Sequence, residues 1–242
     1  ASAPDTLTLL VPAEEVSLDP DTAHRQLILS EDCKSVRWGE TQQDLPDSYQ
    51  RFNSSFCVLG REGFTVGRHC WEVEGEVGAE QHWSVGVARE SLRRKEPIEP
   101  SPDKDIWAVQ YRKGKFVALT SPRIPLSLYP VPKRIWVCLD CTEGQVTFVN
   151  ADNGAEIYMF QSVSLRPSPS TTLLVTTAPK WVGIFLDYEA GEVSFYNLTH
   201  RSHLFAFTSS LSEPLHPYFN LAINKGGQNA IPLTTCPVPA WP

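Results

Sequence analysis

Short stretches in which apolar and polar residues alternate run through most of the chain, and Gly, Pro, Asp and Asn separate them. A period of two is typical of half-buried β-strands, whereas the 3.6-residue period of long helices is nearly absent. Only residues 5–10 and 91–95 are weak helix candidates. The pattern therefore predicts an all-β sandwich or barrel.

Residues 82–89 (HWSVGVAR) show this alternation clearly. Every second residue is large and apolar, and the residues between are small. The large set is Trp83, Val85 and Val87, and the small set is Ser84, Gly86 and Ala88. We expect the large set to face the core and the small set to leave room above the sheet.

Residues 106–120 are predicted to form a hairpin that turns at Lys113 and Gly114. On its first strand, alternate residues form a core face and an opposite, more polar face. The core face is Trp107, Val109 and Tyr111, and the opposite face is Ala108, Gln110 and Arg112. Beside Ser84, Gln110 and Arg112 would border a shallow groove with an amide and a guanidinium. The alternative is an ordinary solvated sheet face.

Residues 132–160 recur at residues 179–207 with an offset of 47 and no gap. The identical positions are core-strand and turn residues: Pro132/Pro179, Lys133/Lys180, Leu139/Leu186, Asp140/Asp187, Gly144/Gly191, Val146/Val193, Phe148/Phe195, Asn150/Asn197 and Phe160/Phe207. Each copy predicts a strand–turn–strand hairpin. Residues 182–187 are apolar on both faces, which indicates a central strand, and Val193 and Phe195 are expected to be buried. Residues 161–178 are predicted to be a loop with one possible strand at 173–176.

Six cysteines in 242 residues are too few for a disulfide scaffold, so we expect free thiols in a reducing, cytoplasmic (intracellular) compartment. Cys138 and Cys141 have the CxxC spacing of zinc and redox sites. They align with Phe185 and Tyr188 in the other copy, which favours core and turn positions. We expect no metal and no cofactor.

Lys plus Arg is 21 and Asp plus Glu is 28, which gives a net charge of −7. That balance argues against nucleic-acid binding. No apolar run reaches the ~18 residues of a membrane span, so no direct membrane insertion is expected. The N-terminus has no basic segment of a signal peptide, and the first residue is not Met, so a fragment of a longer protein is expected.

Three ordered motifs identify a family resemblance. They are residues 18–20 (LDP) with 27–32 (LILSED), residues 71–74 (WEVE) and residues 186–189 (LDYE). Further matching runs lie at 43–47, 51–53, 58–60, 67–69, 87–91, 93–95 and 232–237. The chain resembles the PRY-SPRY domain of tripartite-motif (TRIM) proteins, butyrophilins and pyrin.

The resemblance implies a bent antiparallel β-sandwich, a concanavalin-like jelly roll, with a short N-terminal helical or extended segment. We expect an N-terminal extension at 1–13, one domain at 14–238 (PRY about 14–65, SPRY about 66–238) and a tail at 239–242. The family has one hairpin where this chain has two. The second copy is closer to the family pattern, so we expect it to occupy the sheet. The first copy, an insert at about 132–178, would then pack outside, pair with an edge, stay mobile or swap into a partner.

No nucleophile elbow, phosphate loop or HExxH motif is present, so an enzyme is not expected. The resemblance implies a module that binds a protein or peptide on its outer sheet face and variable loops. The leading hypothesis is the substrate-recognition domain of a TRIM-type E3 ubiquitin ligase, in innate immunity or regulated protein turnover, with the RING outside this chain. The alternatives are a butyrophilin-type intracellular ligand-sensing domain and an assembly domain that dimerises through the extra hairpin.

Matching runs carry the family's partner-binding positions onto Ser84, Gln110, Arg112 and Ile223. Arg89 and Trp38, on flanking segments, are weaker candidates. Antibody-binding members of the family have aromatic residues where this chain has Gln110 and Arg112, which argues against antibody binding. A polar peptide end or an acidic side chain suits an amide and a guanidinium better.

Overall fold

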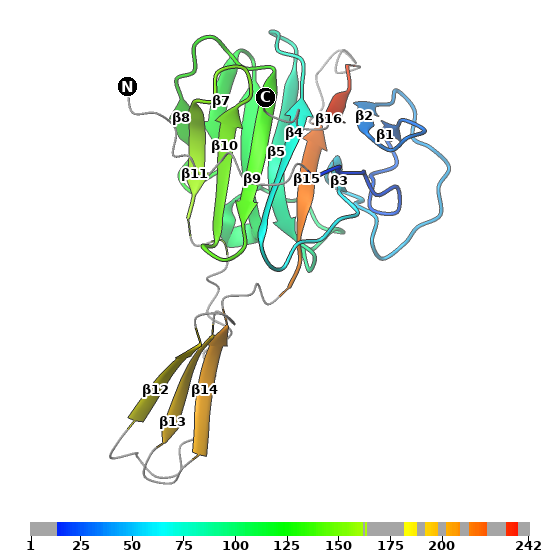
Figure 1. The fold of residues 1–242 in the computed structure, drawn as a ribbon. Helices are drawn as coiled ribbons and strands as arrows, with labels where there is room; N and C mark the ends of the chain where they lie inside the picture. The colour runs from blue at the N-terminus through cyan, green and yellow to red at the C-terminus, as the bar shows by residue number, and fades with distance from the viewer. Residues whose placement is uncertain are drawn as a thin grey trace.

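The computed structural model describes residues 14–161, 163, 182–187, 192–197, 202–208, 213–221 and 231–236. Two large antiparallel sheets and one small sheet account for its strands (Figure 1). The seven-stranded sheet has the order β1 (Leu27–Leu29), β2 (Ser35–Trp38), β16 (Leu233–Cys236), β4 (Arg68–Glu74), β9 (Arg134–Asp140), β10 (Gln145–Asn150) and β11 (Glu156–Phe160). The six-stranded sheet has the order β3 (Cys57–Leu59), β15 (Leu215–Leu221), β5 (His82–Arg89), β6 (Ile106–Arg112), β7 (Lys115–Ala118) and β8 (Ile124–Leu126). The three-stranded sheet contains β12 (Val182–Asp187), β13 (Glu192–Asn197) and β14 (Ser202–Thr208).

The predicted all-β sandwich is confirmed. In the described residues the only helical turn is a 3-10 segment, Pro102–Lys104. Residues 91–95 do not form a helix, because the chain turns at 90–91 and then runs without regular structure. The weak helix candidate at 5–10, the predicted strand at 173–176 and the side chains of Val193 and Phe195 lie outside the described residues.

The two large sheets enclose the main hydrophobic core. Its members include both predicted core sets, Trp83, Val85 and Val87 from β5 and Trp107, Val109 and Tyr111 from β6. The opposing sheet contributes Trp71 and Phe148, which are 1% and 0% exposed. The alternation in the sequence therefore assigned the inward face of both strands correctly.

The predicted hairpin at β6 and β7 is also confirmed, with Arg112 paired to Lys115. Its two turn residues, Lys113 and Gly114, have φ angles of 49° and 81°. Positive φ at both central positions is the geometry of a two-residue turn that matches the twist of the strands. Glycine supplies the second position at no steric cost.

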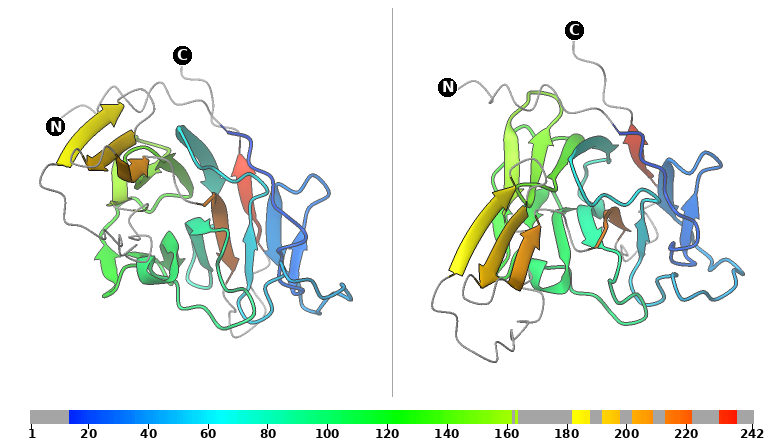
Figure 2. Two further views of the ribbon diagram at one scale, coloured as in Figure 1. Left: turned by 90° about the horizontal axis from the view of Figure 1, so that it is seen from below. Right: turned by 60° about the horizontal axis from the view of Figure 1, so that its bottom comes forward.

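The placement of the two repeat copies differs from the expectation. The first copy, not the second, occupies the large sheet: β9 pairs with β4 along its full length, and β10 and β11 follow. The second copy forms the separate three-stranded sheet, which is drawn below the large sheets in Figure 1 and comes forward in Figure 2. The prediction of a central strand at 182–187 is also wrong, because β12 pairs only with β13.

Contacts on the outer face of β4 explain which copy is chosen. The Trp136 indole Nε1 donates a 2.8 Å hydrogen bond to Oε2 of Glu72, and Arg134 Nη1 lies 3.6 Å from Oε1 of the same carboxylate. Glu72 is 3% exposed, and a buried carboxylate needs such partners. The second copy has Trp181, Gly183 and Phe185 at the positions of Arg134, Trp136 and Cys138. The expectation from the sequence was based on family-like core and turn residues. The residues that determine which copy pairs with β4 lie instead on the outer face of the strand.

The expectation of free thiols is wrong for two cysteines. Cys70 and Cys138 lie directly opposite each other on β4 and β9 and form a disulfide. Cys33, Cys57, Cys141 and Cys236 are free. Cys141 is fully buried, as its alignment with a core or turn position predicts.

Candidate protein-binding face

A row of mostly polar residues crosses the outer face of the six-stranded sheet. In register from β3 to β7, it contains Cys57, Asn220, Ser84, Gln110 and Val117. Gln110 Nε2 donates to Ser84 Oγ at 3.3 Å, and Asn220 Nδ2 donates to Cys57 Sγ at 3.0 Å. The predicted pairing of Ser84 with Gln110 is therefore present, but Ser84 is only 1% exposed while Gln110 is half-buried.

The chain itself fills part of the room expected above the small residues. Ala88 and Ala108 belong to a second hydrophobic cluster with Phe52, Leu92 and Leu119. The small side chains of Ala88 and Ala108 thus accommodate side chains from the protein's own loops.

The hairpin tip carries three exposed cations, Arg112, Lys113 and Lys115. None of the ion pairs found among the described residues involves them. Sequence reasoning singled out Arg112 and missed the two lysines. The turn at Lys113 and Gly114 was the available signal, because it places the residues on either side of it close together.

His82 lies opposite Arg112 in the β5–β6 register. Burial, together with the nearby positive charges of Arg112 and Lys113, lowers the pKa of His82 to about 4. The imidazole is therefore neutral at physiological pH. Among the described residues, the positive charge at this end of the face therefore comes from the three hairpin cations and not from His82.

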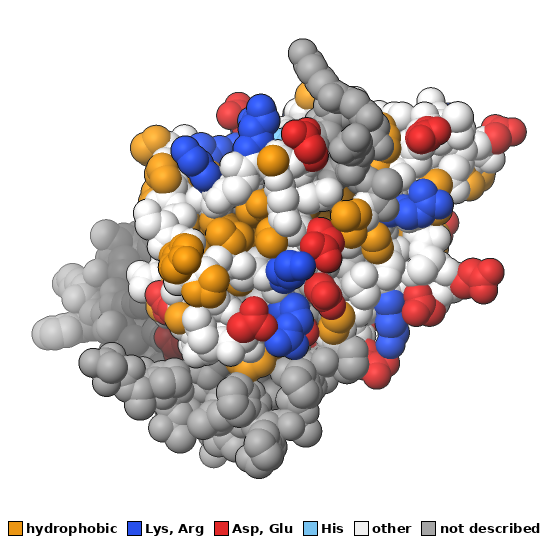
Figure 3. Space-filling view, turned by 90° about the horizontal axis from the view of Figure 1, so that it is seen from above, with side chains coloured by type: hydrophobic (Ala, Val, Ile, Leu, Met, Phe, Trp, Pro, Cys, Tyr) orange, Lys and Arg blue, Asp and Glu red, His pale blue; other side chains and the backbone are white. Residues whose placement is uncertain are grey.

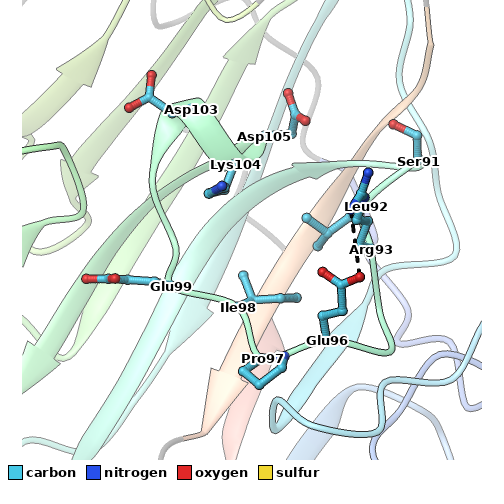
Figure 4. A pocket seen from close by; sticks show the side chains of 10 residues that line it. All are labelled: Ser91, Leu92, Arg93, Glu96, Pro97, Ile98, Glu99, Asp103, Lys104 and Asp105. Carbon is cyan, nitrogen blue, oxygen red and sulfur yellow. Dashed lines mark ion pairs between the residues drawn. The ribbon is translucent and has the colours of Figure 1, made fainter.

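The opposite end of β5 and β6 has a different character. The loop between these strands encloses a hollow of about 440 Å³ (Figure 4). Its lining includes the carboxylates of Glu96, Glu99, Asp103 and Asp105. Arg93 forms an ion pair with Glu96 at 3.7 Å. Arg93 and Lys104 also line the hollow, so this end carries charges of both signs, whereas the hairpin end carries three cations.

The remaining predicted site residues do not lie on an open surface. Arg89 is 2% exposed and forms ion pairs with Asp105 and Glu213. Trp38 lies on β2 of the other sheet, belongs to the main core and packs edge-on against Phe56. Neither side chain is accessible to a partner in this structure. Ile223 lies outside the described residues.

The described part of the chain shows no constellation that calls for chemistry. It contains no group of three or more His, Cys, Asp or Glu side chains placed to hold a metal ion. None of its helical structure has the length and apolarity needed to cross a bilayer. In the end view of Figure 3, Lys and Arg side chains lie among Asp and Glu side chains rather than in an extended surface of one sign.

Two family models match the chain. The PRY model (SPRY-associated domain) covers residues 16–64, and the SPRY domain model covers residues 68–168 and again 164–234. The second SPRY range contains β12 to β15 and ends within β16. Family-like sequence is thus present in both copies of the repeat.

Curated relatives come from two groups of proteins. Butyrophilin subfamily 1 member A1 of Homo sapiens is 45% identical over 159 residues, which is 64% of this chain and 30% of that protein. The E3 ubiquitin-protein ligase TRIM58 of Mus musculus is 41% identical over 157 residues, 63% of this chain and 32% of that protein. The chain spans about a third of the length of these relatives.

Solved structures show the same fold at low identity. The TRIM65 PSpry domain has a TM-score of 0.54 and 18% identity over 98% of this chain and 97% of that one. A stonustoxin structure has a TM-score of 0.55 and 20% identity, covering 97% of this chain and 32% of that one. Because the PRY and SPRY family models match in order over most of the chain, and two large antiparallel sheets enclose one core, the chain belongs to the PRY-SPRY family of TRIM- and butyrophilin-type proteins.

Proposed function

We propose that this chain recognises an acidic segment of a partner protein through the β6–β7 hairpin end of its outer face. The single observation that carries the proposal is a cluster of exposed cations, Arg112, Lys113 and Lys115, which have no ion-pair partner among the described residues and lie beside the amide of Gln110. Gln110, Arg112 and Lys115 lie on paired strands and Lys113 lies in the two-residue turn between them, so their backbone positions are fixed before a ligand arrives. A rigid site loses less conformational entropy on binding.

The chemistry of the cluster favours a carboxylate ligand. A guanidinium can donate two parallel hydrogen bonds to a carboxylate, and the two lysines add positive charge beside it. Gln110 can donate to a peptide carbonyl or accept from a peptide N–H. Because the hairpin is solvent-exposed, we expect binding to weaken as the salt concentration rises.

In the full-length protein, we propose that this domain selects substrates for a TRIM-type E3 ubiquitin ligase, in innate immunity or regulated protein turnover. The relationship to TRIM58 supports this assignment. The domain itself binds and does not catalyse. Ubiquitin transfer would belong to a RING outside the residues described.

A butyrophilin-type ligand-sensing role is the second candidate. It is favoured by 45–48% identity to butyrophilin subfamily 1 member A1 of human and mouse. The same three cations could bind a phosphorylated small molecule. Calorimetry with inorganic pyrophosphate separates the two: micromolar binding that Arg112→Ala abolishes would favour ligand sensing, and no binding favours the protein partner.

Affinity capture from cell lysate tests the leading proposal. Three proteins are compared by quantitative mass spectrometry: the intact domain, the Gln110→Ala/Arg112→Ala variant and the matched control Arg37→Ala. Arg37 is an exposed cation on β2 of the other sheet. We expect partners that bind the intact domain and the control to be lost, at least tenfold, from the double variant of unchanged melting temperature. Partners retained equally by all three proteins would refute the assigned face.

A further inference from the structure

The second copy of the repeat reproduces the strand pairing of the first copy. Shifted by 47 residues, the β9–β10 register becomes the β12–β13 register: Val146 opposite Leu139 corresponds to Val193 opposite Leu186. The β10–β11 register likewise becomes the β13–β14 register. Even the register shift is reproduced, after Phe148 in one copy and after Phe195 in the other. The three-stranded sheet is therefore a complete spare of the β9–β11 unit.

The first strands of the two units, β9 and β12, are alternatives for the same pairing position, the edge of β4. In the first copy β9 occupies this position, with Arg68 Nε 2.6 Å from Asp140 Oδ2 at one end and Lys133 Nζ 3.1 Å from Glu76 Oε2 at the other. Both of these partners are conserved in the second copy as Asp187 and Lys180. β12 therefore has the register and the end residues to pair with β4 in place of β9.

The chain path allows either copy to be the one in the sheet. The segment between Val163 and Glu213 contains the whole second copy, and one side chain contacts both of its ends. Arg89 Nη2 donates to the carbonyl of Val163 at 3.1 Å, and Arg89 Nη1 lies 3.5 Å from Glu213 Oε1. The two ends of the segment that contains the second copy, Val163 and Glu213, therefore lie close together at the sandwich. Each copy follows β8 and precedes β15 in the sequence. Either copy could therefore pair with β4 without changing the strand order of the six-stranded sheet.

We infer that the edge of β4 is a docking site for either copy within one chain, and that the Cys70–Cys138 disulfide selects the first copy. The second copy has Phe185 at the position of Cys138, so it cannot form this bond. A dithiol reductant would cleave the sulfur–sulfur bond by thiol–disulfide exchange. Cys70 and Cys138 each gain a proton as thiols, and the reductant becomes a disulfide. After reduction, the contacts of Trp136 and Arg134 with Glu72 still oppose the exchange but no covalent bond blocks it.

This exchange would remodel the outer face of the seven-stranded sheet. Trp136 and Cys138 would be withdrawn from beside β4, and Gly183 and Phe185 would take their register positions. The inference concerns the sheet opposite the proposed partner-binding face, so it stands independently of that proposal. Two packings of one sequence that differ in few contacts are a known basis of conformational switching.

A transplanted cysteine tests the inference. In the Cys138→Ser/Phe185→Cys variant, the thiol sits at the equivalent position of the second copy. After reoxidation, we expect peptide mapping to find a disulfide between Cys70 and position 185 in most monomeric molecules. The matched control is Cys138→Ser/Ser194→Cys, since position 194 pairs with position 185 and would lie one strand further from β4. A Cys70 that stays fully alkylatable, a bond formed equally in the control, or a bond found only in dimers would overturn the intrachain exchange.

A second measurement uses the unmodified protein, so that the result does not depend on the variant folding. Hydrogen exchange is recorded before and after reduction with dithiothreitol. We expect amides of β9 to exchange at least tenfold faster on reduction and amides of β12 to exchange more slowly. Unchanged exchange in both strands would show that the disulfide does not select the copy.

Discussion

Arg89 is a buried guanidinium that several segments of the chain share. Its Nε lies 3.2 Å from Asp105 Oδ1, and its plane lies 5.6 Å from the ring centre of Trp107. It also contacts Val163 and Glu213, as described above. Arginine suits this position because its planar, permanently charged group can donate in several directions at once. Its family-like position in the sequence therefore reflects a structural role.

We predict that Arg89→Met lowers the free energy of unfolding by about 3–5 kcal/mol, because Asp105 and Glu213 would each lose a buried cationic partner. Urea denaturation followed by tryptophan fluorescence measures this change. The control is Arg93→Met, whose side chain is 83% exposed, and we expect it to change stability by less than about 0.5 kcal/mol. Equal effects of the two substitutions would contradict the structural role of Arg89.

His82 gives the protein a sensitivity to acid. Its folded-state pKa of about 4 lies below its ordinary value of 6.5, so the unfolded chain binds a proton over that interval and the folded chain does not. Stability contributed by neutral His82 is therefore complete above pH 6.5 and is lost as pH falls toward 4. We predict that His82→Gln flattens the decline in melting temperature between pH 6.5 and 4.5. A variant with the same slope as the parent would contradict this assignment.

At the scale of elements, the alternation of apolar and polar residues predicts both hairpins of the repeat but does not predict which of them pairs with β4. The residues at core positions are similar in both copies. The sequence therefore predicts both hairpins correctly, but these residues do not show which hairpin pairs with β4. The outward-facing Trp136, Arg134 and Cys138 favour pairing of the first copy with β4. Their partners Glu72 and Cys70 lie more than 60 residues away in the sequence. Those pairings become visible only when β4 and β9 are placed side by side.

Matched deletions of 47 residues test this ranking. Removing residues 164–210 takes out the spare unit between the two ends held by Arg89, and we expect a folded domain of parental stability. Removing residues 132–178 forces the second copy into the sheet without the disulfide or the Trp136 hydrogen bond. We predict that the second deletion is less stable than the first by about 2–5 kcal/mol. Guanidinium denaturation of both proteins under oxidising conditions measures the difference, and the reverse order of stability would contradict the ranking.

At the scale of the whole molecule, the fold class, both core faces of β5 and β6 and the β6–β7 turn could be predicted from the sequence. The site was predictable in part: Gln110 and Arg112 lie where alternation placed them. The sequence did not reveal that Ser84 is covered or that Phe52 and Leu92 pack against Ala88 and Ala108 of the outer face, because loop packing has no period. Arg89 and Trp38, the weaker site candidates from the sequence, are buried, and a strand pattern does not show which side chains are buried by the rest of the fold.

The proposed partner site gives the molecule a local charge opposite to its overall charge of −7. An acidic ligand would be attracted at the hairpin although the net charge of the molecule is negative, which favours one orientation of approach. Hydrogen–deuterium exchange of the domain with and without a captured partner tests this claim most directly. We predict slower exchange at residues 110–117 in the complex. Protection confined to residues 90–105, with the hairpin unchanged, would contradict the account.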